Sequence, residues 1–121
     1  MRITRSTDNP PELLDATTFS GRPTRQDLGA YDAPEATVLL VTFPAGVRSH
    51  WHRHPGGQFL YFMKGSGRVG TRDGQLAEVS AGDLVHAPPG EEHWHGASEH
   101  EAAAHLAVSL GTTEWLDEVT P

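Results

Sequence analysis

A succession of short apolar runs separated by turn sequences is the feature that most constrains the fold. The 121-residue chain has such runs at 37–43, 58–64, 68–72, 76–79, 84–87 and 105–110. Glycine- and proline-containing turns, such as Asp73-Gly74, separate these runs, and short strands about 8–12 residues apart are typical of an all-β sandwich or barrel. Because no long 3.6-residue periodicity appears, the sequence predicts one all-β domain.

The first third of the chain is more polar than the rest. Residues 1–36 contain Asn9-Pro10-Pro11 and several glycines, and they predict an N-terminal arm with one or two short extended pieces. Residues 37–121 are expected to form the barrel and a C-terminal tail, with one helical turn at 115–119. Both faces of the runs 37–43 and 58–64 carry apolar residues, which an isolated small barrel cannot bury, so we expect a homodimer formed by sheet-to-sheet packing.

Charge and cysteine content exclude several classes of partner and site. Lys and Arg number 9 against 16 Asp and Glu, giving a net charge of −7, which argues against nucleic acid and against an anionic membrane surface. The chain has no cysteine, so a bound metal must be held by nitrogen and oxygen. No signal-peptide segment and no apolar run of about 20 residues is present, so a cytoplasmic protein is expected.

Histidines cluster in the second half of the chain, where all 8 lie between positions 50 and 105. His52 and His54 point to the same face of a strand because side chains alternate along it. Gln58 follows a glycine pair that can turn the chain back, and His93 follows the turn Pro88-Pro89-Gly90. Three imidazoles and an amide oxygen suit one divalent transition metal, namely Mn, Fe, Ni, Cu or Zn, and do not suit calcium. The alternatives are ordinary strand histidines, and a Gln58 that contacts only a ligand water.

Two spaced motifs carry a resemblance to a known family. Gly46-x5-His52-x-His54-x3-Gln58-x6-Gly65 resembles the first cupin motif, and Gly82-x5-Pro88-x-Gly90-x2-His93 resembles the second. The resemblance covers residues 37–110 and implies a jelly-roll barrel, the double-stranded β-helix. Cupins usually have Glu at the position of Gln58 and Asn at that of Ala97. A neutral amide leaves the charge of the metal uncompensated, so the metal should be a stronger Lewis acid and be held less tightly.

The stretches 51–58, 89–97 and 105–107 are similar to those of the bacterial manganese-binding cupin hydroxynitrile lyases. This resemblance implies a small-molecule substrate, manganese as the metal, and metal ligands at His52, His54, Gln58 and His93. It also implies a catalytic base at His105 and a second catalytic residue, His95. The remaining pocket-lining positions that it implies are Leu39, Val41, Ser49 and Ser109.

The residues indicate a metal-dependent enzyme acting on a small organic molecule, and the resemblance implies a lyase. It would cleave a cyanohydrin to an aldehyde and cyanide, with the metal stabilising negative charge and His105 moving the proton. A metal-dependent isomerase or cyclase would use the same parts, and a three-histidine iron site would suit a dioxygenase. A non-catalytic small-molecule-binding protein is the remaining alternative, and His105 as a core histidine is the structural one.

Overall fold

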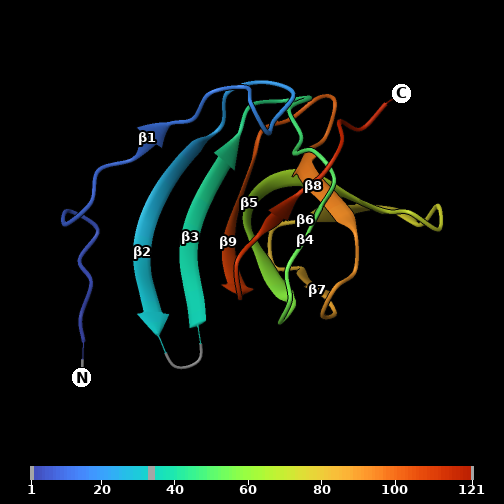
Figure 1. The fold of residues 1–121 in the computed structure, drawn as a ribbon. Helices are drawn as coiled ribbons and strands as arrows, with labels where there is room; N and C mark the ends of the chain where they lie inside the picture. The colour runs from blue at the N-terminus through green and yellow to red at the C-terminus, as the bar shows by residue number, and fades with distance from the viewer. Residues whose placement is uncertain (1, 33–34, 121) are drawn as a thin grey trace.

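The computed structural model describes residues 2–32 and 35–120, and these fold into two antiparallel layers of strands that curl towards each other (Figure 1). The strands are β1 (Glu12–Leu13), β2 (Thr24–Asp32), β3 (Glu35–Phe43), β4 (His52–Arg53), β5 (Gln58–Thr71), β6 (Leu76–Ser80), β7 (Leu84–Ala87), β8 (His93–Ala97), β9 (Ala103–Leu110) and β10 (Glu114–Trp115). The prediction of an all-β barrel is therefore confirmed.

The two layers share one strand. Strands β1, β2, β3, β9, β5 and β7 pair in that order to form the first layer. The second layer runs in the order β6, β5, β8, β4 and β10. The first half of β5 pairs with β9 and β7, and its second half pairs with β6 and β8. Strand β5 thus joins the layers and places Gln58 opposite the histidines of β4 and β8.

Strand β5 bends where it passes between the layers. Its pairing with β9 is shifted between Phe62 and Lys64, and such a bulge increases the local bend of a strand. Gly65 follows with a φ of 74°, a conformation that glycine adopts most readily. The sequence predicts separate strands at 58–64 and 68–72, and this prediction is wrong because Gly65-Ser66-Gly67 bends the strand without ending it.

Alternating side chains build the core between the layers. Phe43 of β3 and Leu60 and Phe62 of β5 are fully buried. In β9 the residues His105, Ala107 and Ser109 are buried, while Leu106, Val108 and Leu110 are only half-buried. The inward face of the first layer is therefore apolar at one end and polar at the other, next to the histidines of the second layer.

The two ends of the chain differ from expectation. Residues 24–32, within the expected arm, form the nine-residue strand β2, which pairs with β3 from Thr24 to Asp32. The expected helical turn at 115–119 is absent among the described residues. Trp115 instead pairs with His52 as part of β10, since the free edge of β4 offers backbone partners there. None of the described residues belongs to a helix with the length and apolarity needed to cross a membrane.

Candidate metal centre

Four histidines line a cavity of about 200 Å³ between the layers, and a fifth, His93, packs against three of them. His52 comes from β4, His54 from the loop after it, His93 and His95 from β8, and His105 from β9. All five imidazoles pack within one cluster of ring contacts, with centroids 4.5–5.8 Å apart. The tertiary structure thus gathers side chains from both layers at one point.

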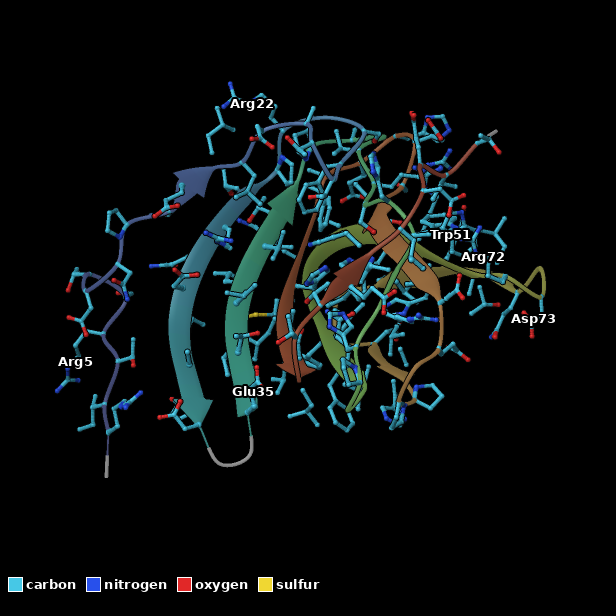
Figure 2. The ribbon with its side chains drawn as sticks, in the orientation of Figure 1. Arg5, Arg22, Glu35, Trp51, Arg72 and Asp73 are labelled. Atoms are coloured by element: carbon cyan, nitrogen blue, oxygen red, sulfur yellow. The ribbon has the colours of Figure 1, made fainter. Side chains whose placement is uncertain are left out.

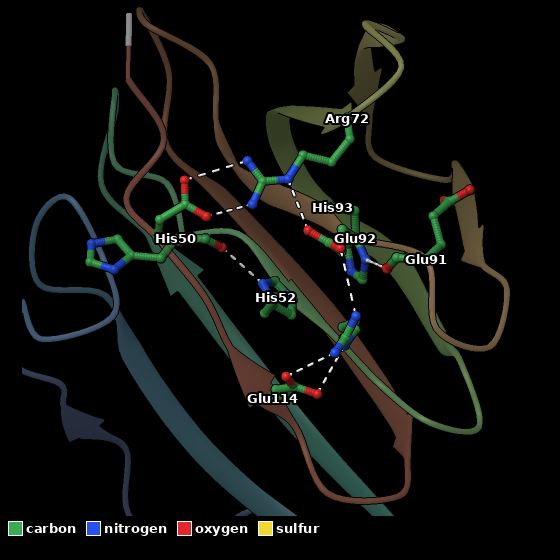
Figure 3. A network of polar contacts seen from close by, with 9 residues as sticks. His50, His52, Arg72, Glu91, Glu92, His93 and Glu114 are labelled. Carbon is green, nitrogen blue, oxygen red and sulfur yellow. Dashed lines mark hydrogen bonds and ion pairs between the residues drawn. The ribbon is translucent and has the colours of Figure 1, made fainter.

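The rings of His52 and His93 are oriented by their local backbone (Figure 3). Nδ1 of His52 lies 2.9 Å from the carbonyl oxygen of His50, and Nδ1 of His93 lies 2.9 Å from that of Glu91. A carbonyl oxygen only accepts hydrogen bonds, so each ring carries its proton on Nδ1. The lone pairs therefore lie on the two Nε2 atoms, where a metal ion would need them.

The ring of His54 is oriented by a side chain and not by its local backbone. Its Nδ1 lies 3.2 Å from the Thr113 hydroxyl oxygen. Its Nε2 is buried and has no hydrogen-bond partner in the part of the chain that the structure describes. A buried polar atom without a partner is costly, typically about 1–3 kcal/mol. A metal ion beside the other two Nε2 atoms would supply the missing partner.

The side-chain oxygen of Gln58 lies close to the Nε2 atom of His93. The side-chain amide of Gln58 donates to the hydroxyl of Ser109 at 3.0 Å, which leaves Oε1 2.8 Å from Nε2 of His93. Both facing atoms carry lone pairs when His93 is protonated on Nδ1. Two acceptors at this distance repel each other unless a cation lies beside them, and a divalent metal meets that need.

His95 and His105 form a buried pair next to these groups. Nε2 of His105 lies 3.0 Å from Nδ1 of His95, so one proton is shared between the two rings. Nε2 of His95 lies 3.2 Å from Nε2 of His52. Phe43 and Phe62 pack against His105. The pair can therefore hold or pass a proton at the edge of the cluster.

Burial sets the protonation of the cluster. Desolvation is the largest cause that lowers the pKa of His52 to about 3, with the nearby His93 adding to it. Desolvation likewise lowers the pKa of His54 and of His105 to about 4. The pKa of His93 and that of His95 are also lowered by burial. All five rings are neutral at pH 7, and the neutral ring is the form that binds metal ions.

The candidate ligand atoms fall into two overlapping sets. His52, His93 and His95 offer nitrogen atoms that all lie within 4.8 Å of one another. The set expected from sequence contains His54 and Gln58 in place of His95. The orphaned Nε2 of His54 and the fixed Oε1 of Gln58 favour the second set.

Of the four expected pocket residues, three line the cavity: Leu39, Val41 and Ser109. Ser49 does not. It is fully buried behind the histidines, where its hydroxyl oxygen lies 3.5 Å from Nδ1 of His52 and accepts a hydrogen bond from the backbone of His95. Ser49 therefore supports the imidazoles instead of facing a substrate.

Other lining residues come from outside the two sequence motifs. They are Leu14, Asp15, Thr18, Phe19, Arg25, Thr37, Phe43, Ala107, Thr113 and Trp115. Trp115 packs over the ring of His52, with centroids 4.7 Å apart, and against Phe19. No local pattern marks those near the chain ends, such as Leu14, Phe19 and Trp115, because long-range strand pairing alone brings both ends of the chain to the cavity.

Comparison with known proteins decides the family. The family model described as "Cupin domain" matches residues 39–109 of the chain. The chain belongs to the cupin family. This cupin is 37% identical over 97 residues to a protein named (R)-mandelonitrile lyase from Granulicella tundricola, and the match covers 74% of each chain.

One further sequence match and one structural match were found. This cupin is 33% identical over 72 residues to an acireductone dioxygenase from Gluconacetobacter diazotrophicus, covering 57% of this chain and 40% of that one. A crystal structure of a cupin-like protein from Thermotoga maritima superposes with a TM-score of 0.79 at 34% identity. That superposition covers 97% of this chain and 86% of the other. The superposition shows the same fold in the Thermotoga protein, and the two relatives found by sequence carry names from two reaction classes.

Proposed function

We propose that this cupin is a metal-dependent lyase that cleaves a small cyanohydrin to an aldehyde and cyanide. The ligands of one divalent transition metal would be His52, His54, Gln58 and His93. One observation carries the proposal: Nε2 of His93 lies 2.8 Å from Oε1 of Gln58, while its Nδ1 contacts the carbonyl oxygen of Glu91, which assigns the ring proton to Nδ1. A bound cation removes the repulsion between these two acceptor atoms.

The donor set supports a first-row transition metal. Three imidazole nitrogens and one neutral amide oxygen are borderline ligands that suit Mn, Fe, Ni, Cu and Zn. We propose manganese, on the resemblance of the ligand motifs to those of the manganese-binding lyases. When bound, the metal supplies Lewis acidity that stabilises negative charge developing on the substrate.

The residues of the chain supply the proton transfer. His105 is fully buried and neutral at pH 7, so it can accept the hydroxyl proton of a cyanohydrin, and His95 can share that proton across their 3.0 Å contact. The electron pair of the O–H bond becomes the new carbonyl bond of the aldehyde. The electron pair of the C–C bond leaves with cyanide, which takes the proton back as hydrogen cyanide.

The rest of the cavity suits an apolar substrate body. Leu39, Val41 and Phe43 of β3 line it, and so do Phe19 and Trp115, which pack against each other. A small aldehyde with an aromatic or aliphatic side chain would bury its apolar surface there, with its polar end at the histidines. The relative named as a mandelonitrile lyase supports the same substrate class.

A dioxygenase is the second candidate. The match to a protein named as an acireductone dioxygenase favours it, and a three-imidazole site with iron can bind oxygen and a chelating substrate. Iron in the purified protein with oxygen uptake would favour this candidate. Turnover that is independent of oxygen would favour the lyase.

Metal analysis and a turnover assay test the proposal together. Purified protein is expected to contain about one transition-metal ion per chain and to release cyanide from mandelonitrile. His54→Ala should lose the metal, whereas His95→Ala should retain it and lose turnover. A wild type without metal would overturn the site, and a metallated wild type without cyanide release would overturn the lyase and leave a binding protein or another enzyme. Metal loss in His95→Ala but not in His54→Ala would move the ligand set to His52, His93 and His95.

A further inference from the structure

The segment after β9 crosses the outside of the candidate metal centre. Residues 112–119, here called the C-terminal strap, run antiparallel to residues 51–53. Glu114 and Trp115 pair with Arg53 and His52. The backbone of Leu116 donates to the carbonyl of Trp51 at 2.8 Å, and that of Trp51 donates to the carbonyl of Asp117 at 3.0 Å. The strap is therefore a strand-like extension of the edge that carries His52 and leads to His54.

A chain of ion pairs fixes the strap in place (Figure 3). Glu114 accepts two hydrogen bonds from Arg53, each 2.9 Å long. Arg53 and Arg72 both contact Glu92, and Arg72 also pairs with Asp117. Single exposed ion pairs contribute little, but a connected network with bidentate arginines holds a defined geometry.

The network continues onto an aromatic ring. The guanidinium of Arg72 lies 4.1 Å from the ring centroid of Trp51, and Figure 2 shows the two side chains together beside β5 and the strap. Arg48 adds a hydrogen bond of 3.1 Å to the carbonyl of Val119. The strap is thus anchored near both of its ends, with Thr113 at its start.

The imidazole rings of His52, His54 and His93 differ in the group that contacts Nδ1. His52 and His93 contact the carbonyl oxygen of the residue two positions earlier, so their own strands orient them. His54 has a contact of this kind only with Thr113, which is 59 positions away. Its ring orientation, and the direction of its buried Nε2, therefore depend on where the strap places one hydroxyl group.

We propose that Thr113 is the positioning residue for His54, which makes the C-terminal strap part of the metal centre. The Thr113 hydroxyl accepts the Nδ1 proton of His54, and this keeps the lone pair on Nε2, facing the other ligands. The proposal rests on the ligand set of the proposed function, in which His54 binds the metal. Groups that orient metal-binding imidazoles typically contribute about 10–100-fold to metal affinity.

Two neighbouring threonines provide a matched test. Thr113→Val keeps the shape of the side chain and removes the hydroxyl. Thr112→Val makes the same change in an exposed residue whose hydroxyl contacts Glu35 at 3.1 Å. Manganese affinity of the full chain would be measured by calorimetric titration, with the melting temperature of the metal-free protein recorded in parallel. Thr113→Ser, which retains the hydroxyl, serves as the rescue variant.

We expect Thr113→Val to weaken manganese binding about 10–100-fold. Thr113→Ser should bind like the wild type, and so should Thr112→Val. Wild-type affinity in Thr113→Val would overturn the positioning role, as would equal losses in the Val and Ser variants. A wild type that binds no manganese, zinc or iron would overturn the proposed function itself. A wild type that binds metal with an unaffected Thr113→Val would overturn only the role of Thr113.

Discussion

Gln58 is the single residue that most distinguishes this candidate metal centre from the usual cupin pattern. A carboxylate at this position would add a negative charge to the ligand set, whereas the amide adds none. Ser109 accepts the amide hydrogen bond of Gln58 at 3.0 Å, so the oxygen is held towards His93. The charge of the site is therefore set by one side chain whose orientation is fixed from β9.

Replacing Gln58 with Glu should strengthen metal binding. We expect tighter manganese binding on the order of tenfold, because the carboxylate neutralises part of the charge of the ion. Cyanohydrin cleavage should slow, since a compensated metal is a weaker Lewis acid. Calorimetric titration and a cyanide-release assay would measure both effects.

Gln75→Glu is the matched control for Gln58→Glu, because it adds the same charge at an exposed position. It should change neither quantity. Weaker metal binding in Gln58→Glu, with turnover unchanged, would show that Gln58 is not a ligand.

His105 is the residue on which the proposed proton transfer depends. His105→Ala should retain metal and fold but lose turnover by about 10²–10⁴-fold, the usual loss for a positioned acid or base. The cyanide-release rate would be measured alongside metal content and melting temperature, because His105 also packs against Phe43 and Phe62. His100→Ala, at an exposed position, is the control. Wild-type turnover by fully metallated His105→Ala would remove His105 from the mechanism.

At the scale of elements, strand β5 links the two layers and so determines the distance between the halves of the site. Gln58 lies at its start, in the first layer, and its second half pairs with β8, which carries His93 and His95. The bend at Gly65 allows one strand to serve both sheets. A change at this bend should affect the whole fold, although it lies outside the cavity.

Gly65→Ala should be strongly destabilising. A Cβ atom at Gly65 would overlap the carbonyl oxygen of Ala102, and the φ of 74° is itself unfavourable for alanine. We expect a loss of about 2–5 kcal/mol in the free energy of unfolding, combining roughly 1–2 for the backbone with roughly 1–3 for the clash.

Gly74→Ala separates the two contributions. Gly74 has a φ of 92° but no atom within 4 Å of an added Cβ, so only the backbone cost of about 1–2 kcal/mol applies. Chemical denaturation of both variants would measure the difference. Equal losses in the two variants would mean that the β5 bend tolerates a side chain at Gly65.

For the whole molecule, the outer face of the first layer is apolar across four strands. Phe59 and Tyr61 of β5 are 39% and 44% exposed, and Leu84 of β7 is 63% exposed. The strand register places Tyr61 between Leu84 of β7 and Leu106 of β9. The same face continues through Val108 to Val38 and Leu40 of β3. A continuous apolar surface of this kind is typical of a subunit interface, and we propose that a second copy of the chain covers it.

Leu84→Glu should weaken this association. The substitution places a charge on the apolar face, and we expect wild-type protein to sediment as a dimer at micromolar concentration and Leu84→Glu to shift towards the 13.1 kDa monomer. Leu76→Glu is the matched control, because Leu76 is 68% exposed but lies on β6 in the other layer. Analytical ultracentrifugation would distinguish them. A monomeric wild type would rule out the dimer.

The sequence by itself determined the class of fold and the chemistry available at the site. The short apolar runs and their turns predicted an all-β barrel, because the alternation of side chains along a strand is a local property. The same alternation put His52 and His54 on one face, and the resemblance to the two cupin motifs implied Gln58 and His93 as the other metal ligands. The lack of cysteine limited the possible ligands to nitrogen and oxygen.

Only the tertiary structure decided which distant groups surround those residues. The continuation of β5 through Gly65, the pairing of Trp115 with His52, and the contact of Thr113 with His54 all join segments that carry no shared local pattern. Ser49 matched a pocket position in sequence yet lies behind the imidazoles. Long-range pairing follows from the burial and hydrogen bonding of the whole sheet, so positions near the chain ends acquire their roles only when the layers close.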